Sequence, residues 1–404
     1  MSIDVRTVEN FDEYEQAFMS IGQYFGMDSS PEWIERFSRL LPFDHLHAAF
    51  EDGLIVGGAG AFPFELSVPG GRLPCAGTTV VGVAPTHRRR GVLTAMMRAQ
   101  LDDAHERGAP LAALWASEET IYGRFGYGIG VYTGEARVPT ERTGFALPLE
   151  RRGTVRFVDV DEARVLFPPI WDALAQERPG VFTRSPEWWD LRTLDDPSER
   201  RGGSGPKRYV VLEVDDAPAG YAIYRHHMSW ADGISTGTVK VIEATGTSPQ
   251  ANAELWRYLL DIDWIASIEL QLMPADHPLF FLLANPRHLH YRSGDGLWVR
   301  LLDVGAALSG RTYTTDDAIV FGVADAFCPW NEGTWKLADG SAARTEAAPD
   351  LRVDVRELGS AYLGSIGFRQ LAQGGLVDEL TPGALDRADR LFRHGFAAWC
   401  PEIF

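Results

Sequence analysis

The chain has 404 residues, of which 45% are hydrophobic and 23% charged, as in an ordinary globular protein with room for two to four domains. Its formal net charge of −18 argues against a nucleic-acid-binding protein, whose surface is basic, and is compatible with a cationic substrate. The 3 widely spaced cysteines, the lack of a secretory signal and the lack of a long apolar run predict a cytoplasmic chain with free thiols, no bound metal and no membrane partner.

The first 70 residues predict two helices followed by strands. Aromatic and aliphatic residues recur at helical spacing over residues 5–24, and Ser30 with Pro31 indicates the start of a second helix. Residues 45–51 and 54–69 read as strands around the Asp52-Gly53 turn. This order places a helical pair ahead of the strand-rich core.

The next stretch carries the clearest chemistry. A β-branched strand over residues 79–83 stops at Pro85 and is followed by three arginines, Gly91 and an amphipathic helix. A helix start offers unpaired N–H groups and the positive end of a dipole, and Gly91 allows close approach, so a phosphate-bearing ligand is expected here. The alternative is a basic turn on a solvated surface. Neither a Walker-type loop nor a G-x-G-x-x-G is present, which argues against ATP and dinucleotides.

A second apolar strand, residues 111–116, leads to Ser117 at the position expected for a helix N-cap, with Glu118 in the first turn. Tyr122 follows one turn later, so it should share a site with the loop. A tyrosine there is either a proton donor or a packed core residue.

Two motifs carry a family resemblance. Residues 81–93, VGVAPTHRRRGVL, resemble the acetyl-CoA loop of GNAT N-acetyltransferases, although Leu93 stands where Gly or Ala is usual. Together with residues 116–128, ASEETIYGRFGYG, they resemble the Eis (enhanced intracellular survival) family of aminoglycoside N-acetyltransferases. The resemblance implies an α/β (α+β) fold: tandem GNAT-like domains followed by a sterol-carrier-protein-like domain.

The same resemblance implies the site. Strand backbone would hold the pantetheine arm of acetyl-CoA, and the loop and helix start would hold its pyrophosphate. The implied cofactor-binding residues are Val81, Gly82, Val83, Arg88, Arg89, Arg90, Gly91, Val92, Leu93, Thr94, Ser117 and Glu118. Tyr122 would be the general acid, and the C-terminal carboxylate of Phe404 the base. An apolar chain end argues weakly against a frayed tail, although a simple anchor is the alternative.

The rest of the chain predicts two further domains. After a charged linker near residues 140–153, the order of strands and helices repeats, but its hinge at residues 246–250, GTSPQ, has no arginine. We therefore expect domains at 1–150 (catalytic), 151–303 (GNAT-like without a cofactor loop) and 304–404 (sterol-carrier-protein-like), the last with helical segments around 358–371 and 384–392.

Three functional hypotheses follow. The first is acetyl transfer from acetyl-CoA to amines of a polyamine or aminoglycoside, at one or several positions, with no nucleic acid as partner. The second is acetylation of a protein lysine or N-terminus, and the third is a non-catalytic lipid-binding or structural protein. By position alone, Asp28, Trp33 and Glu402 are candidates for contacting a cationic substrate. The resemblance also implies a homohexamer.

Overall fold

The computed structural model describes residues 3–26 and 30–404. The chain divides into two compact units: Met1–Val131 with Gly296–Ala398 and Ile403–Phe404, and Tyr132–Asp295 with Trp399–Glu402. The domain boundaries expected at 150 and 303 stay predictions. Within the described residues, none of the helices combines the length and the apolar character needed to cross a membrane.

Seven strands form the first sheet of unit 1. In spatial order they are β1 (Asp4–Thr7), β2 (Leu46–Glu51), β3 (Leu54–Val68), β4 (Gly71–Val83), β5 (Leu111–Trp115), β16 (Leu297–Leu301) and β6 (Gly128–Ile129). All neighbours are antiparallel except β4 and β5, which run parallel. A parallel pair needs a crossover, and helix α3 (Val92–Glu106) supplies it.

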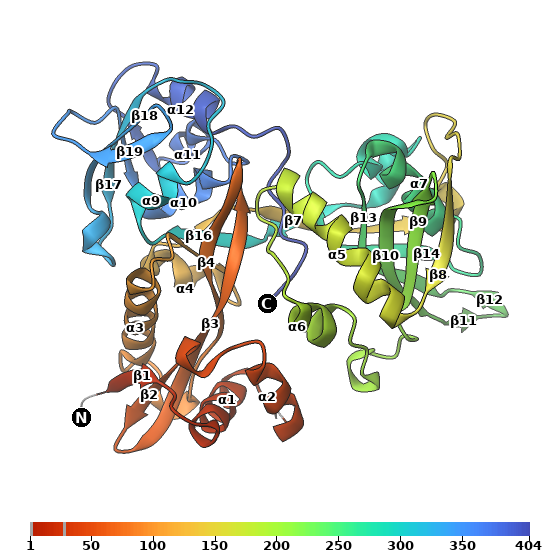
Figure 1. Cartoon of the computed structure of the whole chain (residues 1–404), viewed down its shortest axis with the longest axis horizontal. Helices are drawn as coiled ribbons and strands as arrows, with labels where there is room; N and C mark the ends of the chain where they lie inside the picture. Colours follow the sequence, from red (N-terminus) through yellow and green to blue (C-terminus); the bar gives the residue numbers. More distant parts are fainter. Residues whose placement is uncertain (1–2, 27–29) are drawn as a thin grey trace. The chain divides into compact units, whose positions relative to one another are not determined.

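Helices cover both faces of this sheet. A Cβ on Gly57 would meet Met96 of α3, whereas a Cβ on the next residue, Gly58, would meet Ile21 of α1 (Phe11–Phe25). Because successive residues of a strand face opposite sides, α3 and α1 pack on opposite faces (Figure 1). α2 (Pro31–Ser38) begins as predicted, with Ser30 accepting from the N–H of Trp33.

The helix predicted over residues 5–24 starts later than expected. Asp4–Thr7 pairs with β2 as an edge strand, and Asn10 caps α1 by accepting from the N–H of Glu13. The apolar spacing identified the helix, but the cap residue sets where it begins.

A five-stranded sheet and four helices complete unit 1. The strands, in spatial order, are β19 (Ser341–Arg344), β18 (Gly333–Ala338), β17 (Ile319–Ala324), β20 (Leu351–Asp354) and β21 (Val377–Glu379), and the helices are α9 (Val304–Ser309), α10 (Val355–Tyr362), α11 (Phe368–Gln373) and α12 (Ala384–Phe392). The helical segment expected around 358–371 is two helices, because Gly364 adopts a left-handed conformation with φ 81°. The rings of Phe321, Phe368 and Phe392 pack together.

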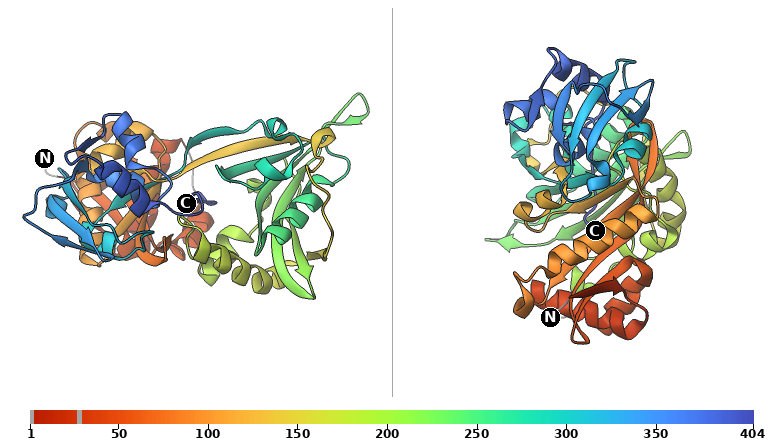
Figure 2. Two further views of the ribbon diagram at one scale, coloured as in Figure 1. Left: turned by 90° about the horizontal axis from the view of Figure 1, so that it is seen from above. Right: turned by 90° about the vertical axis from the view of Figure 1, so that its left-hand side faces the viewer.

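Unit 2 is built on a second seven-stranded sheet. Its spatial order is β15 (Arg292–Asp295), β7 (Tyr132–Pro139), β14 (Ser267–Pro274), β13 (Thr238–Gly246), β10 (Ala217–His227), β9 (Arg208–Val214) and β8 (Gly153–Val158). Val210 and Leu212 of β9 share a core with α7 (Pro249–Leu260), whereas Tyr209 and Val211 share one with α5 (Val160–Glu177). The two helices therefore cover opposite faces; Figure 2 shows this sheet from two further directions.

A buried histidine in unit 2 makes stability depend on pH. His277 lies 5.0 Å from the ring of Trp256 and accepts from the N–H of Leu279 (3.2 Å). Burial lowers its pKa to about 3 from an ordinary 6.5, and Arg178 adds to the effect. The unfolded chain therefore binds a proton below pH 6.5 that the folded state excludes, so stability falls with pH from 6.5 down to 3.

We expect acidification from pH 7 to pH 5 to remove about 2 kcal/mol from the free energy of unfolding through this residue. His277→Asn keeps an acceptor for Leu279 but cannot be protonated, so its loss of Tm between the two pH values should be smaller than that of the wild type. Calorimetry at both pH values tests this. Equal losses would show that His277 is not responsible.

Candidate functional site

The site begins where two strands of the first sheet separate. β4 pairs with β5 only from Cys75 to Gly77, opposite Leu111 to Ala113. Against β3, Gly58 pairs with Gly82 but Gly60 pairs with Thr79, so β4 holds an extra residue there. This bulge puts Val80 at φ 46°, a left-handed conformation that is rare for a β-branched residue. The strands splay apart beyond this point, and over residues 78–83 one edge of β4 pairs with no strand among the described residues.

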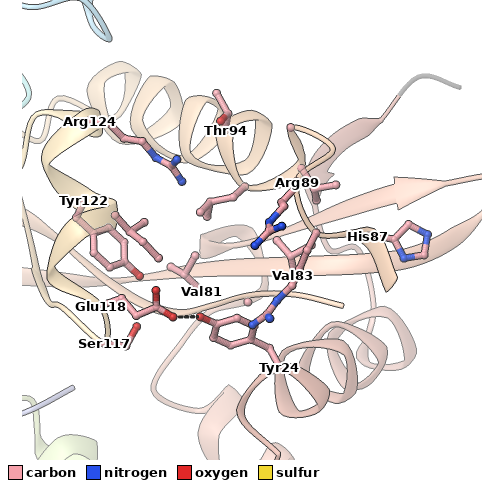
Figure 3. A pocket seen from close by; sticks show the side chains of 16 residues that line it. Tyr24, Val81, Val83, His87, Arg89, Thr94, Ser117, Glu118, Tyr122 and Arg124 are labelled. Atoms are coloured by element: carbon pink, nitrogen blue, oxygen red, sulfur yellow. Dashed lines mark hydrogen bonds between the residues drawn. The ribbon is translucent and has the colours of Figure 1, made fainter. Parts of the chain in front are cut away.

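A cavity of about 640 Å³ lies along this edge (Figure 3). It is lined by Tyr24, Val81, Gly82, Val83, His87, Arg88, Arg89, Gly91, Val92, Leu93, Thr94, Ser117, Glu118, Ile121, Tyr122 and Arg124. All twelve residues predicted to bind the cofactor, except Arg90, are in this set. The structure thus brings together the strand, the loop, the helix start and the segment after β5.

The start of α3 provides groups that suit an anion. Gly91 is the N-cap residue, with φ 85°, and no side chain caps the helix. The first residues, Val92 to Thr94, line the cavity, so their N–H groups and the positive end of the helix dipole suit a diphosphate. Arg88 and Arg89 add positive charge beside them. These groups fit the pyrophosphate of a coenzyme A.

Arg90, which was predicted to bind the cofactor, does not line the cavity. Its guanidinium pairs with the buried carboxylate of Glu51, which also lies 3.0 Å from Nε2 of His87. The other ring nitrogen of His87 lies 2.8 Å from the hydroxyl of Thr86. Arg90 and His87 therefore anchor the loop to β2. Figure 3 shows the His87 ring at the edge of the cavity, away from Tyr122.

Tyr122 lies in the short helix α4 (Glu119–Tyr122), with only 6% of its surface exposed. Burial raises the pKa of Tyr122 to about 12, although its hydrogen bond with Ser117 opposes the shift. The hydroxyl therefore keeps its proton at neutral pH. Ser117 is not the helix cap that we expected: Glu118 takes the N-cap position and caps nothing with its side chain. Instead, Glu118 accepts from the hydroxyl of Tyr24 (3.0 Å; Figure 3).

A second cavity, of about 300 Å³, adjoins the first. It is lined by Phe25, Thr78, Thr79, Val80, Val81, Leu114, Trp115, Ala116, Ser117, Tyr122, Ile403 and Phe404. Val81, Ser117 and Tyr122 line both cavities. The last residue of the chain thus lies in the wall of a cavity that also contains Tyr122, as the predicted roles of the two residues require.

Aromatic rings hold the chain end in place. The ring of Phe404 packs edge-on against Phe64, with centroids 5.1 Å apart, and lies 6.4 Å from Phe62. Both partners belong to β3. The apolar end noticed in the sequence is therefore anchored to the sheet beside the second cavity.

Two of the three residues predicted to contact a substrate have partners outside the two cavities, and the third lies outside the described residues. Trp33 stacks on Phe37 at 4.9 Å and belongs to the lining of neither cavity. Glu402 accepts from Arg184 (2.9 Å) and from the indole N–H of Trp188 (2.5 Å), within unit 2. Asp28 lies outside the described residues. Their roles in binding substrate stay predictions.

Several cavity residues were not anticipated from the sequence. Tyr24, Phe25 and Trp115 line the two cavities, yet none belongs to a motif, and Arg124 lies within the second motif but was given no role. They come from segments that meet only in the folded chain. Apolar periodicity marked Tyr24 as a core-facing residue, and nothing else distinguished it.

The equivalent helix of unit 2 cannot bind an anion in the same way. Ser248 caps α7 by accepting from the N–H of Ala251 (3.1 Å), and Pro249, the first helical residue, has no N–H to offer. The N–H of Ala251 is thus satisfied by the chain itself. That the second GNAT-like part lacks a cofactor loop stays a prediction.

Comparisons with known proteins agree with the geometry. Family models described as acetyltransferase (GNAT) domains match residues 4–130 and 180–301, and a sterol carrier protein domain matches residues 304–401. An uncharacterized N-acetyltransferase of Streptomyces avermitilis is 42% identical over the full length of both chains. N-acetyltransferase Eis of Mycobacterium tuberculosis is 33% identical, covering 93% of this chain and 92% of its own.

A solved structure is similar along the whole chain. The crystal structure of Eis1 from Mycobacterium abscessus superimposes with a TM-score of 0.87 at 34% identity, covering 99% of this chain and 100% of its own. The predicted order of two GNAT domains and a sterol-carrier-protein-like domain is thereby confirmed. The two acetyltransferase matches imply use of an acyl-CoA.

Gly91 and Gly108 provide a matched test of the anion site. Both adopt positive φ, 85° and 79°, at opposite ends of the α3 segment, and an added Cβ would touch nothing at either position. Alanine strains the backbone similarly at both, but only Gly91 borders the cavity.

We expect Gly91→Ala to weaken coenzyme A binding at least about tenfold, because the loop would leave the left-handed conformation that aims the N–H groups. Gly108→Ala should leave binding within about twofold, given its distance from the cavity. Isothermal titration calorimetry with coenzyme A measures both. Equal losses in the two variants would contradict this account of the site.

Proposed function

The chain belongs to the Eis family of GNAT N-acetyltransferases, and we propose that it transfers the acetyl group of acetyl-CoA to a primary amine of a cationic small molecule, the class that includes aminoglycosides. One or several amines of the same substrate could be acetylated. The observation that carries the proposal is the shared wall of the two cavities: Tyr122 lines both the cavity at the start of α3 and the cavity that Phe404 lines.

Acetyl-CoA, when bound, supplies an acetyl group activated as a thioester. The uncapped start of α3 would hold its pyrophosphate, and the free edge of β4 at Val81 to Val83 would hold the pantetheine arm. The reacting end of the arm would then point toward Tyr122. Enzymes gain much of their rate acceleration by holding the reacting groups close together and aligned, as this arrangement would.

Phe404 and Tyr122 would move the two protons. A primary amine is mostly an ammonium ion at neutral pH, and it must lose a proton before it can attack. The carboxylate of Phe404 is ionised at neutral pH and would accept that proton. The hydroxyl of Tyr122, kept protonated by burial, would donate to the departing sulfur and regain a proton from the amine through the carboxylate or solvent.

Two wider expectations belong to the same proposal. A cytoplasmic location would provide acetyl-CoA and suits three cysteines that are all buried and form no disulfide. A homohexamer is implied by the family resemblance alone. Both stay predictions.

Tyr122→Phe removes the hydroxyl and keeps the ring that packs near Tyr127 at 6.2 Å. We expect kcat to fall about a hundredfold or more, while the affinity for acetyl-CoA changes less than about twofold. Thiol release from acetyl-CoA and calorimetry measure the two quantities. Tyr132→Phe, at an exposed tyrosine of unit 2, is the control and should match the wild type. Unchanged turnover in Tyr122→Phe would remove Tyr122 from the mechanism.

Adding three glycines after Phe404 leaves the ring in place but moves the terminal carboxylate up to about 10 Å along the chain. We expect turnover to fall about a hundredfold, with the melting temperature and acetyl-CoA affinity maintained. The same tripeptide placed before Met1 serves as the control. An extended enzyme with normal turnover would rule out the carboxylate as the base.

A further inference from the structure

A third cavity, of about 270 Å³, lies within unit 1 between α3 and the strands β2, β3 and β4. No residue lines both this cavity and either of the two cavities described above. Thr94 lines the first cavity, whereas Asp103, about 14 Å further along α3 at 1.5 Å per residue, lines the third. The third cavity is therefore separate from the site of the proposed acetyl transfer.

Small side chains create this space. Nearer its start, α3 fills the interface with the sheet through Met96, which is fully buried against β3. Around the cavity, the apolar part of the wall consists of small or cyclic residues: Ala61, Pro63, Pro74, Ala76, Ala104 and Ala109. Close-packed protein interiors contain few spaces larger than a water molecule. Because a cavity of about 150 Å³ holds a benzene ring, this one has room for two fused rings.

His47 brings an unsatisfied polar group to the same wall. Only 4% of this residue is exposed, and its Nδ1 has no hydrogen-bond partner among the described residues. Its Nε2 lies 3.9 Å from Oδ2 of Asp103, which is beyond hydrogen-bond distance. Burial lowers the pKa of His47, so the ring is neutral at pH 7 and carries one donor and one acceptor. A hydroxyl group both donates and accepts, and it therefore suits this ring in either tautomer.

The charged groups around the cavity are paired with one another or solvated. Arg107 donates to both oxygens of Asp103 (2.9 and 3.0 Å) and to the carboxylate and the carbonyl of Asp44 (2.9 Å each). His45 lies 3.4 Å from the same guanidinium, and burial lowers its pKa. Glu65 is exposed to solvent. An ionic ligand would lose water against the apolar wall, and Arg107 and Asp103 already pair with each other, so the cavity favours an uncharged ligand.

We infer that the third cavity binds an uncharged, largely apolar molecule of one or two rings that carries a hydroxyl group, and that His47 is the hydrogen-bond partner of this hydroxyl. The inference does not depend on the proposed acetyl transfer.

The arrangement of the wall orients such a molecule. His45 and His47 lie on the β2 side, whereas Pro74 and Ala76 belong to β4, with β3 between the two strands. A ligand that spans the cavity thus meets a polar end and an apolar end. Burial of its rings against the small apolar side chains favours binding, and its hydroxyl gives a partner to an imidazole that the described residues leave unsatisfied.

The probe is 2-naphthol, which has two fused rings and one hydroxyl, and 2-naphthoate is its charged counterpart. Isothermal titration calorimetry with the full chain, in saturating coenzyme A, measures both. We expect one 2-naphthol per chain with a Kd below about 1 mM, and an affinity for 2-naphthoate at least about tenfold weaker. Lack of 2-naphthol binding, as for a cavity that holds only water, or an equal affinity for the anion would overturn the inference.

Two leucine substitutions on α3 locate the bound probe. Ala104 is buried and lines the cavity, whereas Ala99 is half-buried and does not line it. A leucine at position 104 would fill the space of the ligand, so we expect Ala104→Leu to weaken 2-naphthol binding at least about tenfold and Ala99→Leu to leave it within about twofold. Ala76→Leu fills the cavity from β4 if Ala104→Leu does not fold. Binding that survives these substitutions would place the probe elsewhere and overturn the inference.

A second pair of variants tests the hydrogen bond. His47→Leu removes both ring nitrogens, whereas His47→Gln keeps a donor and an acceptor. We expect His47→Leu to weaken 2-naphthol binding about fivefold or more and His47→Gln to lose less than half as much. Equal affinities in the two variants would overturn His47 as the partner of the hydroxyl. Thiol release from acetyl-CoA is a separate readout, so failure of the proposed acetyl transfer would be distinguished from failure of this inference.

Discussion

Loss of backbone pairing between β4 and β5 beyond Gly77 and Ala113 is the constraint on which the site depends. A buried chain of hydrogen bonds involves Thr78, the first residue of β4 beyond this pairing. The side-chain amide N–H of Gln100 donates to the carbonyl of Gly60 (2.7 Å), so the side-chain oxygen of Gln100 accepts from the hydroxyl of Thr78 (3.2 Å). The oxygen of Thr78 then accepts from the hydroxyl of Tyr127 (3.0 Å). These bonds satisfy buried polar groups and link β3, β4 and α3 at the point where the pairing with β5 ends.

The strained backbone at Val80 follows from the same geometry. A φ of 46° is an unfavourable backbone conformation for a β-branched residue. It persists because β4 pairs with β3 on both sides of the bulge, at Thr79 and at Gly82. The bulge turns the chain so that Val81 lines both cavities. Strain at this point therefore belongs to the construction of the site.

Two helix starts in the repeated fold differ in the groups that they offer to an anion. At α3, Gly91 supplies no cap, and the loop before it is tied down through Glu51. At α7, Ser248 and Pro249 satisfy or remove the N–H groups that an anion would need. The difference involves two or three residues and requires no change in the sheet. The sequence indicated a difference through the missing arginine at residues 246–250, whereas the capping by Ser248 is a finding of the structure.

The sequence by itself determined the strand, arginine-rich loop and helix of residues 79–106, the position of Tyr122 after a second strand and the apolar chain end. Motif spacing and the alternation of apolar residues act over a few residues, which is why these features could be predicted. Tertiary structure alone decided that Arg90 pairs with Glu51, 39 positions away, and that Glu402 is bound by Arg184. It also placed Phe25 and Phe404 in one wall. The direction of a side chain and the partner that it bonds depend on residues that are distant in the sequence. Packing of the folded chain brings these residues together, and local sequence rules do not predict that packing.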